Sequence, residues 1–505
     1  MSRSRPDSTP SRTDAANAPT AGAFVFVLVV VGLQAACLGA ARDVLWGLHV
    51  AAFLPVGVAA AGWVLLVAGG GAVATGRLAV LERAVAPRTV GRWTWVVVPL
   101  VAGVLFWLLR SRQDLLGDAF PLIHGLPEGE ATHPRQPLTM WLQQQLYAGL
   151  GPLFAGAGDT VETARRTVAL GSVSCGVAFT FVARGLGREL VALLPDDRRT
   201  VAPDAVALLI ALQGWSLLFF GYLENYTFVA LVLAAWLWTT LRALRTGGSL
   251  VPAGLLFVLA VGLHLSTAAL APLLVLAVFL HGRAHRHWID AAATTAVTVV
   301  AAIALQVALG AVDPTFSLVA RIAGVLEVAR QDQGGGAGLS YLSSARHWND
   351  WFNAQMLLGP VGVFALIIGA VAFAVREGRA RRRSIFARAG VVLLLAAAGL
   401  VAAAHWSTVE PALGYARDWD LFAPTSVFVT VAAVFVLLSL GSPRAQRRVL
   451  VLALGLSLWH TGTWVALNAS EARSRERFAH LPLGLGRTEV VLARRHLQDG
   501  DEAGA

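Results

Sequence analysis

Residues 93–118, WTWVVVPLVAGVLFWLLRSRQDLLGD, decide the fold expected of this chain. The apolar run 93–110 is close to the ~20 residues that a helix needs to cross a bilayer. Asp118 follows the end of that run by eight residues, near the expected membrane surface. The stretch therefore predicts a membrane-spanning helix that delivers a carboxylate to one face of the bilayer.

Similar apolar runs recur along the whole chain. Its 505 residues are 56% hydrophobic and 14% charged, which exceeds what a soluble core needs. The sequence predicts an all-α polytopic membrane protein of about 13 transmembrane helices. The predicted spans are 21–40, 48–72, 93–110, 163–184, 203–220, 225–242, 250–263, 266–281, 290–311, 355–375, 388–405, 422–440 and 448–467. His264 interrupts the stretch 250–281, which crosses either once as a tilted helix or twice as a hairpin.

Arginine sets the predicted topology. The net charge of +10 comes from arginine alone, since the sequence contains no lysine. The arginines gather in short loops, which indicates the cytoplasmic side of a membrane protein and argues against nucleic-acid binding. Successive loops alternate correctly only if 250–281 crosses twice. The composition is typical of a GC-rich bacterial genome, so we expect a multi-pass inner-membrane protein with a cytoplasmic N-terminus.

The long loop 111–162 then lies on the outer face and carries the first candidate catalytic residue. A partly buried Asp118 would act as a general base toward an acceptor hydroxyl. The alternatives are a solvated loop acid or a helix N-cap. His133-Pro134 follows in the same loop, ahead of an apolar face in 139–147 that is typical of an interfacial helix.

Four short motifs follow one another in a familiar order: Gly117-Asp118, His133-Pro134 with Pro137-Leu138, Glu224 with Tyr226, and Gly262 to Ser266. Over about residues 93–280 they resemble the protein O-mannosyltransferase-like branch of the GT-C glycosyltransferases. The resemblance implies an inverting enzyme that takes a sugar from a polyprenyl-phosphate carrier on the outer face, with Asp118 as the catalytic carboxylate. Two predicted spans ahead of residue 93 depart from that family.

The chain is accordingly divided into four parts. Residues 1–20 are expected to be a disordered cytoplasmic tail, and 21–92 two additional transmembrane helices. Residues 93–467 would form the GT-C-like catalytic domain, and 468–505 a short external tail. Cys37 and Cys175 lie in apolar runs, so neither a disulfide framework nor a cysteine metal site is expected.

Other outer-face residues are candidates for substrate binding beside His133. Glu224, Tyr226 and His264 lie at span ends, where ionisable groups are functional hypotheses; capping, anchoring and packing roles are the alternatives. The segment before the span 422–440 combines an arginine suited to phosphate with a tryptophan suited to a sugar ring, in Tyr415, Arg417, Asp418, Trp419 and Asp420.

No cofactor is certain from the sequence, and a divalent cation is possible. A divalent cation would find weak candidate ligands in His347 and Asp350, which a helix places on one side. The expected partners are a polyprenyl-phosphate sugar donor, membrane lipids and a protein or glycan acceptor, with no nucleic acid. A multispanning transporter or flippase of lipid-linked sugars is the alternative function, and a non-catalytic membrane scaffold is a third.

Overall fold

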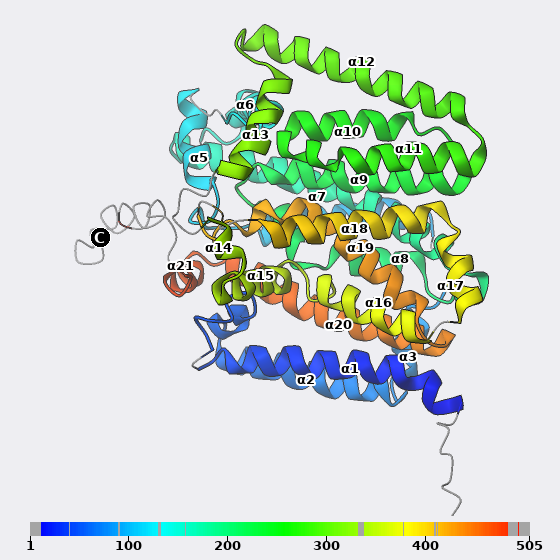
Figure 1. The fold of residues 1–505 in the computed structure, drawn as a ribbon. Helices are drawn as coiled ribbons and strands as arrows, with labels where there is room; N and C mark the ends of the chain where they lie inside the picture. The colour runs from blue at the N-terminus through cyan, green and yellow to red at the C-terminus, as the bar shows by residue number, and fades with distance from the viewer. Residues whose placement is uncertain are drawn as a thin grey trace, which may run out of the picture.

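In the part of the chain that the computed structural model describes, all regular secondary structure is helical. That part is residues 12–482, apart from 40, 89–90, 130–132, 157, 332–337, 377, 409–410 and 412, together with residue 493. The long helices run side by side, with α12 at one edge of the bundle and α1 and α2 at the other (Figure 1). The protein is a multi-pass membrane protein.

The helices have the following bounds. The N-terminal part comprises α1 (Arg12–Ala36), η1 (His49–Phe53), α2 (Val56–Ala74), α3 (Ala79–Ala84), α4 (Thr94–Leu108), α5 (Ala119–Glu128), α6 (Pro137–Leu150) and η2 (Gly151–Leu153). The middle comprises α7 (Thr160–Leu193), η3 (Asp196–Arg198), α8 (Pro203–Ala211), η4 (Gly214–Phe219), α9 (Tyr226–Thr246), α10 (Val251–Leu263), η5 (Leu265–Leu270), α11 (Ala271–His285) and α12 (Trp288–Val312). The C-terminal part comprises α13 (Leu318–Gln331), α14 (Gly338–Leu342), α15 (Ala345–Leu358), α16 (Val363–Arg376), α17 (Arg379–Phe386), α18 (Ala389–Ser407), η6 (Trp419–Leu421), α19 (Ala423–Ser439), α20 (Pro443–Asn468) and α21 (Glu471–Ala479).

The predicted number of 13 spans is not confirmed. Among the described residues, eight helices are long and apolar enough to cross a membrane, and the bent pair α15 and α16 would make a ninth. Helices α4, α10 and α19 are apolar but shorter. The predicted span 203–220 is broken into α8 and η4, where a side chain at Gly214 would collide with the carbonyl of Leu357. Apolar composition alone does not reveal such a break.

The N-terminal helices pack as a unit against α20. Helices α1, α2 and α20 share a hydrophobic core that is separate from the main one. Gln34 is buried in it, and its side-chain oxygen accepts the indole N–H groups of Trp63 and Trp459 at 3.0 Å each. Helix α1 already begins at Arg12, inside the segment predicted as a tail, and residues 1–11 lie outside the described part.

The stretch 250–281 forms a hairpin. Ser249 and Leu250, at the start of α10, both donate hydrogen bonds to the carboxylate of Asp290. His281, near the end of α11, lies 3.2 Å from the same carboxylate. The start of α10 and the end of α11 therefore lie at the same end of the bundle, and the chain reverses at His264, as the arginine alternation favours.

The two ends of the bundle differ in their chemistry. At one end, arginines of the basic loops form ion pairs with acids of neighbouring helices, in Arg184–Asp204, Arg245–Glu189 and Arg448–Glu82. The opposite end carries α5, α6, α13, α14, α15 and α21 (Figure 1). The predicted C-terminal tail thus contains α21, whose Arg477 and Phe478 are buried, while 483–505 except 493 lies outside the described part.

Candidate functional site

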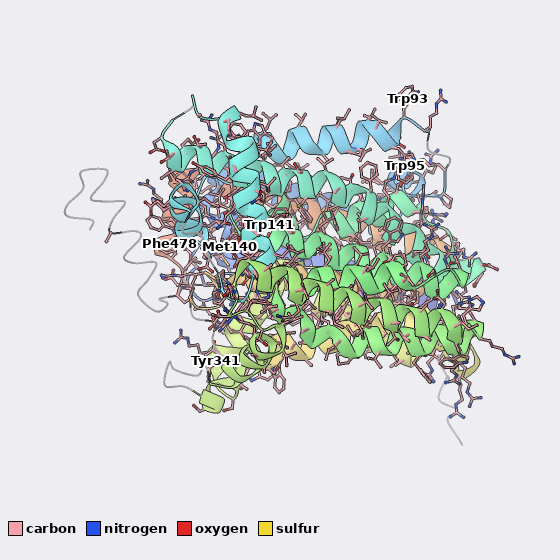
Figure 2. All side chains as sticks on the ribbon, turned by 90° about the horizontal axis from the view of Figure 1, so that it is seen from above. Trp93, Trp95, Met140, Trp141, Tyr341 and Phe478 are labelled. Atoms are coloured by element: carbon pink, nitrogen blue, oxygen red, sulfur yellow. The ribbon has the colours of Figure 1, made fainter. Side chains whose placement is uncertain are left out.

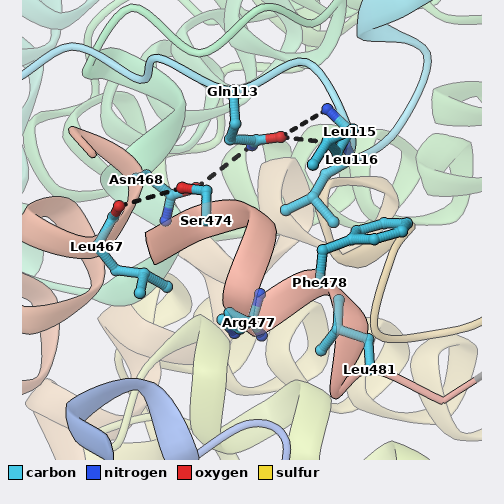
Figure 3. Close-up of a pocket in the computed structure, with 9 residues that line it drawn as sticks. All are labelled: Gln113, Leu115, Leu116, Leu467, Asn468, Ser474, Arg477, Phe478 and Leu481. Carbon is cyan, nitrogen blue, oxygen red and sulfur yellow. Dashed lines mark hydrogen bonds between the residues drawn. The ribbon is translucent and has the colours of Figure 1, made fainter. Parts of the chain in front are cut away.

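The segment between α4 and α5 is held in place by backbone pairing. The N–H of Ser111 donates to the carbonyl of Phe220 and the N–H of Arg112 to that of Asn468, both at 2.8 Å. The side-chain oxygen of Gln113 accepts the N–H groups of the next residues, and its amide donates to Asn468 at 3.3 Å (Figure 3). Helix α21 lies against this segment (Figure 3). The chain that leads to Asp118 is therefore anchored to the ends of α20 and η4.

Gly117 allows three distant segments to meet. Its φ of +61° lies in the left-handed region, and its N–H donates to the carbonyl of Arg417 at 3.0 Å. A Cβ at this position would collide with the carboxylates of Glu224 and Asp420. The next N–H, that of Asp118, donates to the Glu224 carboxylate. Only glycine satisfies both the backbone angle and the close approach of two acids.

Two carboxyls of this cluster are buried. Glu224 is 1% exposed and Asp420 is 0% exposed. Burial, together with the neighbouring charges of Asp420 and Asp118, raises the pKa of Glu224 well above its usual range. Burial and the charges of Asp418 and Asp118 raise the pKa of Asp420 in the same way. Both groups therefore favour the neutral, protonated form.

Asp420 is a buried acid without a well-formed hydrogen bond at either oxygen. The hydroxyl of Tyr222 lies beside it and itself accepts the indole N–H of Trp419 at 3.2 Å. Burial and the charges of Asp420 and Glu224 raise the pKa of Tyr222, so its proton is retained. An unsatisfied carboxylate would be costly here, and protonation of Asp420 removes that cost.

Asp118 differs from these buried acids because its side chain is 28% exposed. Its carboxylate lies 4.0 Å from Nε2 of His133, which is exposed to a similar degree. Asp118 occupies the N-cap position of α5 but its side chain caps no N–H of that helix. The helix-cap alternative is thus not supported, and the group faces the accessible side of the acidic cluster.

The segment carrying His133 packs on the turn at His264. The N–H of Leu265 donates to the carbonyl of Arg135, and the hydroxyl of Thr139 donates to that of Leu263, both at 2.8 Å. Burial, followed by the charges of His133 and Arg135, lowers the pKa of His264 to about 3. His264 is therefore a neutral ring.

Tyr226 completes this side of the site. Its ring stacks on His264 with the centroids 5.4 Å apart. It lies within electrostatic reach of the carboxylates Asp118, Glu224, Asp418 and Asp420. Of the residues expected to bind substrate, His133, Glu224, Tyr226, His264 and Asp420 are thus brought together around Asp118.

Most of the segment 415–420 serves packing. Tyr415 donates to the carbonyl of Thr408 at 2.8 Å and stacks on Phe422. Trp419 is 0% exposed, so it offers no free ring face to a sugar in this arrangement. Arg417 is 2% exposed, with its guanidinium 4.5 Å from the ring of Phe478. Asp418 is the member that is partly exposed.

His347 and Asp350 lie apart from this cluster. Asp350 accepts hydrogen bonds from the indole of Trp46 at 3.1 Å and the hydroxyl of Tyr341 at 3.0 Å. It therefore ties α15 to the segment that follows α1. His347 is buried against the rings of Tyr341 and Tyr415. Across the described residues, no three histidines, cysteines or acids are arranged to hold a metal ion.

Comparisons with known proteins give structural matches only. No protein-family model matches the sequence, and a search of curated proteins finds no match. Among solved structures, the chain is similar to ArnT from Cupriavidus metallidurans bound to undecaprenyl phosphate, at 13% identity and a TM-score of 0.41 over 75% of this chain and 78% of ArnT.

The chain is also similar to the oligosaccharyltransferase of Archaeoglobus fulgidus. Its complex with Zn and sulfate matches at 15% identity and a TM-score of 0.39, over 74% of this chain and 53% of that one. The apo form matches at 13% identity and a TM-score of 0.40, over 78% and 60%. The protein O-mannosyltransferase-like branch is not shown by these matches. The likeness concerns the helical arrangement and assigns no residue role in this chain.

Two residues near Asp118 were not singled out from the sequence. Tyr222 precedes Glu224 by two positions and lies beside Asp420. Arg135 follows His133-Pro134 and is a partly exposed cation close to His264. The only sequence signal for either was its position next to a motif residue, because burial and long-range contacts are not visible in the spacing.

Gly117→Ala should disrupt the site more than a matched substitution elsewhere. We expect it to cost about 1 kcal/mol for the left-handed backbone and more for the collision with the two carboxylates. Gly129→Ala is the control, because Gly129 has a φ of +71° but open space around its Cβ position. Unfolding midpoints of the two purified variants in detergent compare the costs. Equal destabilisation would show that the close approach at Gly117 is unimportant.

Protonation of Asp420 predicts a pH dependence. Its folded-state pKa is raised, so the stability contributed by the neutral form is complete below the ordinary aspartate pKa and is lost as pH rises through the raised value. Asp420→Asn, which is neutral at every pH, should lose less stability between about pH 5 and 8. Thermal unfolding across this range measures the effect, with the exposed Asp196→Asn as control. Parallel pH curves for wild type and Asp420→Asn would contradict it.

Proposed function

We propose that this protein is an integral-membrane glycosyltransferase that moves a sugar from a polyprenyl-phosphate donor to an acceptor hydroxyl. The observation that carries the proposal is the contrast between the partly exposed Asp118 and the buried Glu224 and Asp420 beside it. Neighbouring carboxyl groups that differ in burial, with one of them accessible to a substrate, are typical of acid–base sites. Asp118 and Glu224 belong to motifs that resemble those of the GT-C glycosyltransferases, whereas Asp420 lies outside these motifs.

The proposed step is a single displacement at the anomeric carbon. Asp118 removes the proton from the acceptor hydroxyl while the new C–O bond forms and the bond to the carrier phosphate breaks. The polyprenyl phosphate leaves with the bonding electrons, and the configuration inverts. Glu224 and Asp420 are neutral in this scheme, so the negative charge stays on Asp118, where the acceptor can reach it. No step is assigned to a divalent cation.

We propose that the site faces away from the cytoplasm. The acidic cluster and the basic loops lie at opposite ends of the bundle, and arginine-rich loops stay on the cytoplasmic side. A lipid-linked donor would then present its phosphate at the outer surface, level with Asp118. The acceptor is a protein or glycan that approaches from the same side.

The donor phosphate is assigned to Arg135 in preference to Arg417. Arg417 is covered by Phe478, and its backbone carbonyl, rather than its side chain, holds Gly117. Arg135 is partly exposed and lies next to His133 and His264. A guanidinium is suited to two parallel hydrogen bonds to a phosphate. Arg417 then supports the Asp118 turn, and Arg135 contacts the carrier.

Asp118→Asn should remove transfer while leaving the protein folded and inserted. The amide keeps the shape of the side chain but does not accept the proton, so we expect a loss of about 10²-fold or more. Purified protein is incubated with a panel of polyprenyl-phosphate sugars, and hydrolysis or transfer is measured. The control is Asp313→Asn, which changes an exposed acid following α12. Activity within a few-fold of wild type would exclude Asp118 as the base.

Arg135→Lys and Arg417→Lys separate the two assignments. Lysine keeps the charge but loses the planar fork, so Arg135→Lys should raise the donor KM by roughly tenfold. Arg417→Lys should lower the unfolding midpoint through loss of stacking on Phe478, with the donor KM of the folded fraction unchanged. Donor titrations and thermal unfolding of both variants distinguish the roles. If only Arg417→Lys raised the donor KM, Arg417 rather than Arg135 would be the residue that binds the donor phosphate.

A further inference from the structure

A cavity lies at the same end of the bundle as the acidic cluster around Asp118. It is formed by the end of α4, the start of α7 and the segment at the start of α21. Its volume is about 460 Å³. Charged side chains dominate its lining, namely Arg110, Arg112, Arg165, Arg166, Glu162 and Glu471. It shares no lining residue with the acidic cluster around Asp118.

The carboxylates around this cavity pair with only two of its four arginines. Glu162 pairs with both Arg165 and Arg166, at 3.4 and 2.7 Å, and the buried Asp114 pairs with Arg165 at 2.7 Å. Glu471 pairs with Arg475, which does not line the cavity. Arg110 and Arg112 make no ion pair with a described carboxylate. Partial burial, followed by the charges of Arg112 and Arg166, lowers the pKa of Arg110. Arg110 and Arg112 therefore supply the positive charge of the cavity that no ion pair with a described carboxylate offsets.

Arg110 is positioned by an aromatic side chain rather than by an acid. Its guanidinium lies 4.4 Å from the ring centre of Trp107 and donates to the carbonyl of the same residue at 3.0 Å. The ring of Trp107 stacks in turn on Phe154. The contacts with Trp107 orient the guanidinium of Arg110 without pairing it with an acid. The charge therefore stays available to an anion.

The surface next to the cavity is apolar. Leu105, Leu108 and Leu109 of the α4 segment and Leu153 of η2 are exposed large hydrophobic residues. Helix α4 lies at the edge of the bundle, with Trp93 at its far end (Figure 2). In a membrane these side chains would face acyl chains, with the arginines at the level of the headgroups.

We propose that this arginine cavity binds the phosphate headgroup of an anionic phospholipid of the surrounding bilayer. Guanidinium groups match phosphate geometry, and basic residues at a membrane surface attract anionic lipids. The acyl chains would lie along the exposed leucines of α4. This inference does not depend on the proposed transfer reaction, since the cavity and the acidic cluster are separate sites.

A lipid bound here would stabilise the segment that carries Asp118. Ser111 lines the cavity, and its N–H pairs with the carbonyl of Phe220. Gly221 lies directly against the side chain of Arg110, and a Cβ there would be 2.6 Å from that of Arg110. The cavity wall therefore includes the chain that leads to Gly117-Asp118, and the residue just before Tyr222 packs against Arg110 of that wall.

Lipid binding to the purified full chain tests the proposal. The protein is delipidated in a neutral detergent and titrated with phosphatidylglycerol or with phosphatidylcholine of the same acyl chains, and bound lipid is counted by native mass spectrometry. We expect preferential binding of phosphatidylglycerol. Arg112→Gln should weaken it by about fivefold, and the double variant Arg110→Gln/Arg112→Gln by about 30-fold.

The variants are matched for charge and for folding. Arg473→Gln removes one arginine of α21 at the same end of the bundle, matches the single variant Arg112→Gln in charge, and should bind as wild type does. Arg112 is exposed, so Arg112→Gln is expected to fold even if loss of the stacked Arg110 destabilises the double variant. An unfolding midpoint equal to that of wild type verifies this.

Four results would overturn the proposal. Equal binding of the two lipids would show that headgroup charge is not recognised, and unchanged binding in Arg112→Gln would place the lipid elsewhere. Displacement of phosphatidylglycerol by millimolar inorganic phosphate would indicate a site for a free anion. Displacement by polyprenyl phosphate at equal concentration would make the cavity part of the donor site.

Discussion

The close approach of Gly117 to two buried carboxyls is the constraint on which the site depends. The absent side chain lets the segments before α5, α9 and α19 meet, although they are far apart in the sequence. The N–H groups of Gly117 and Asp118 donate to Arg417 and Glu224, one from each of the other two segments. These hydrogen bonds hold the backbone at Asp118 in place and so limit the directions in which its side chain can point.

Burial then raises the pKa of two acids of this cluster. Four carboxylates so close together would repel one another if all were ionised, and water is excluded from Glu224 and Asp420. Protonation of these two relieves the repulsion, and the low pKa of His264 keeps positive charge off the adjoining turn. At the opposite end of the bundle, the charge of the buried acids is offset in another way. Glu82 and Glu189 there are each paired with an arginine.

The sequence predicted the helical membrane architecture, the hairpin at His264 and the grouping of Asp118, Glu224 and His264 at one end. These features follow from hydropathy and the spacing of arginines, which act locally along the chain. The prediction of 13 spans is not confirmed. The predicted span 203–220 divides between α8 and η4 at the closely packed Gly214, and α4, α10 and α19 are shorter apolar helices. The roles of Trp419 and Asp350 were not visible either. Their residue types suggested a sugar contact for Trp419 and a metal contact for Asp350. In the structure Trp419 is buried and pairs with Tyr222, and Asp350 pairs with Trp46. Both partners lie far away in the sequence, so these contacts cannot be read from local spacing.

The acidic cluster and the arginine cavity are joined by one short stretch of chain, from Arg110 to Asp118. Its first residues line a positive cavity beside exposed leucines, and its last residues join a group of acids. If this segment shifted toward or away from the membrane, a charged side chain at one of its ends would be buried without a partner, which is costly. The position of the segment at the membrane surface is therefore defined. Asp118 would therefore stay at a fixed depth relative to the lipid headgroups, as the proposed role of Asp118 requires, because the acceptor hydroxyl has to meet a donor held in the membrane.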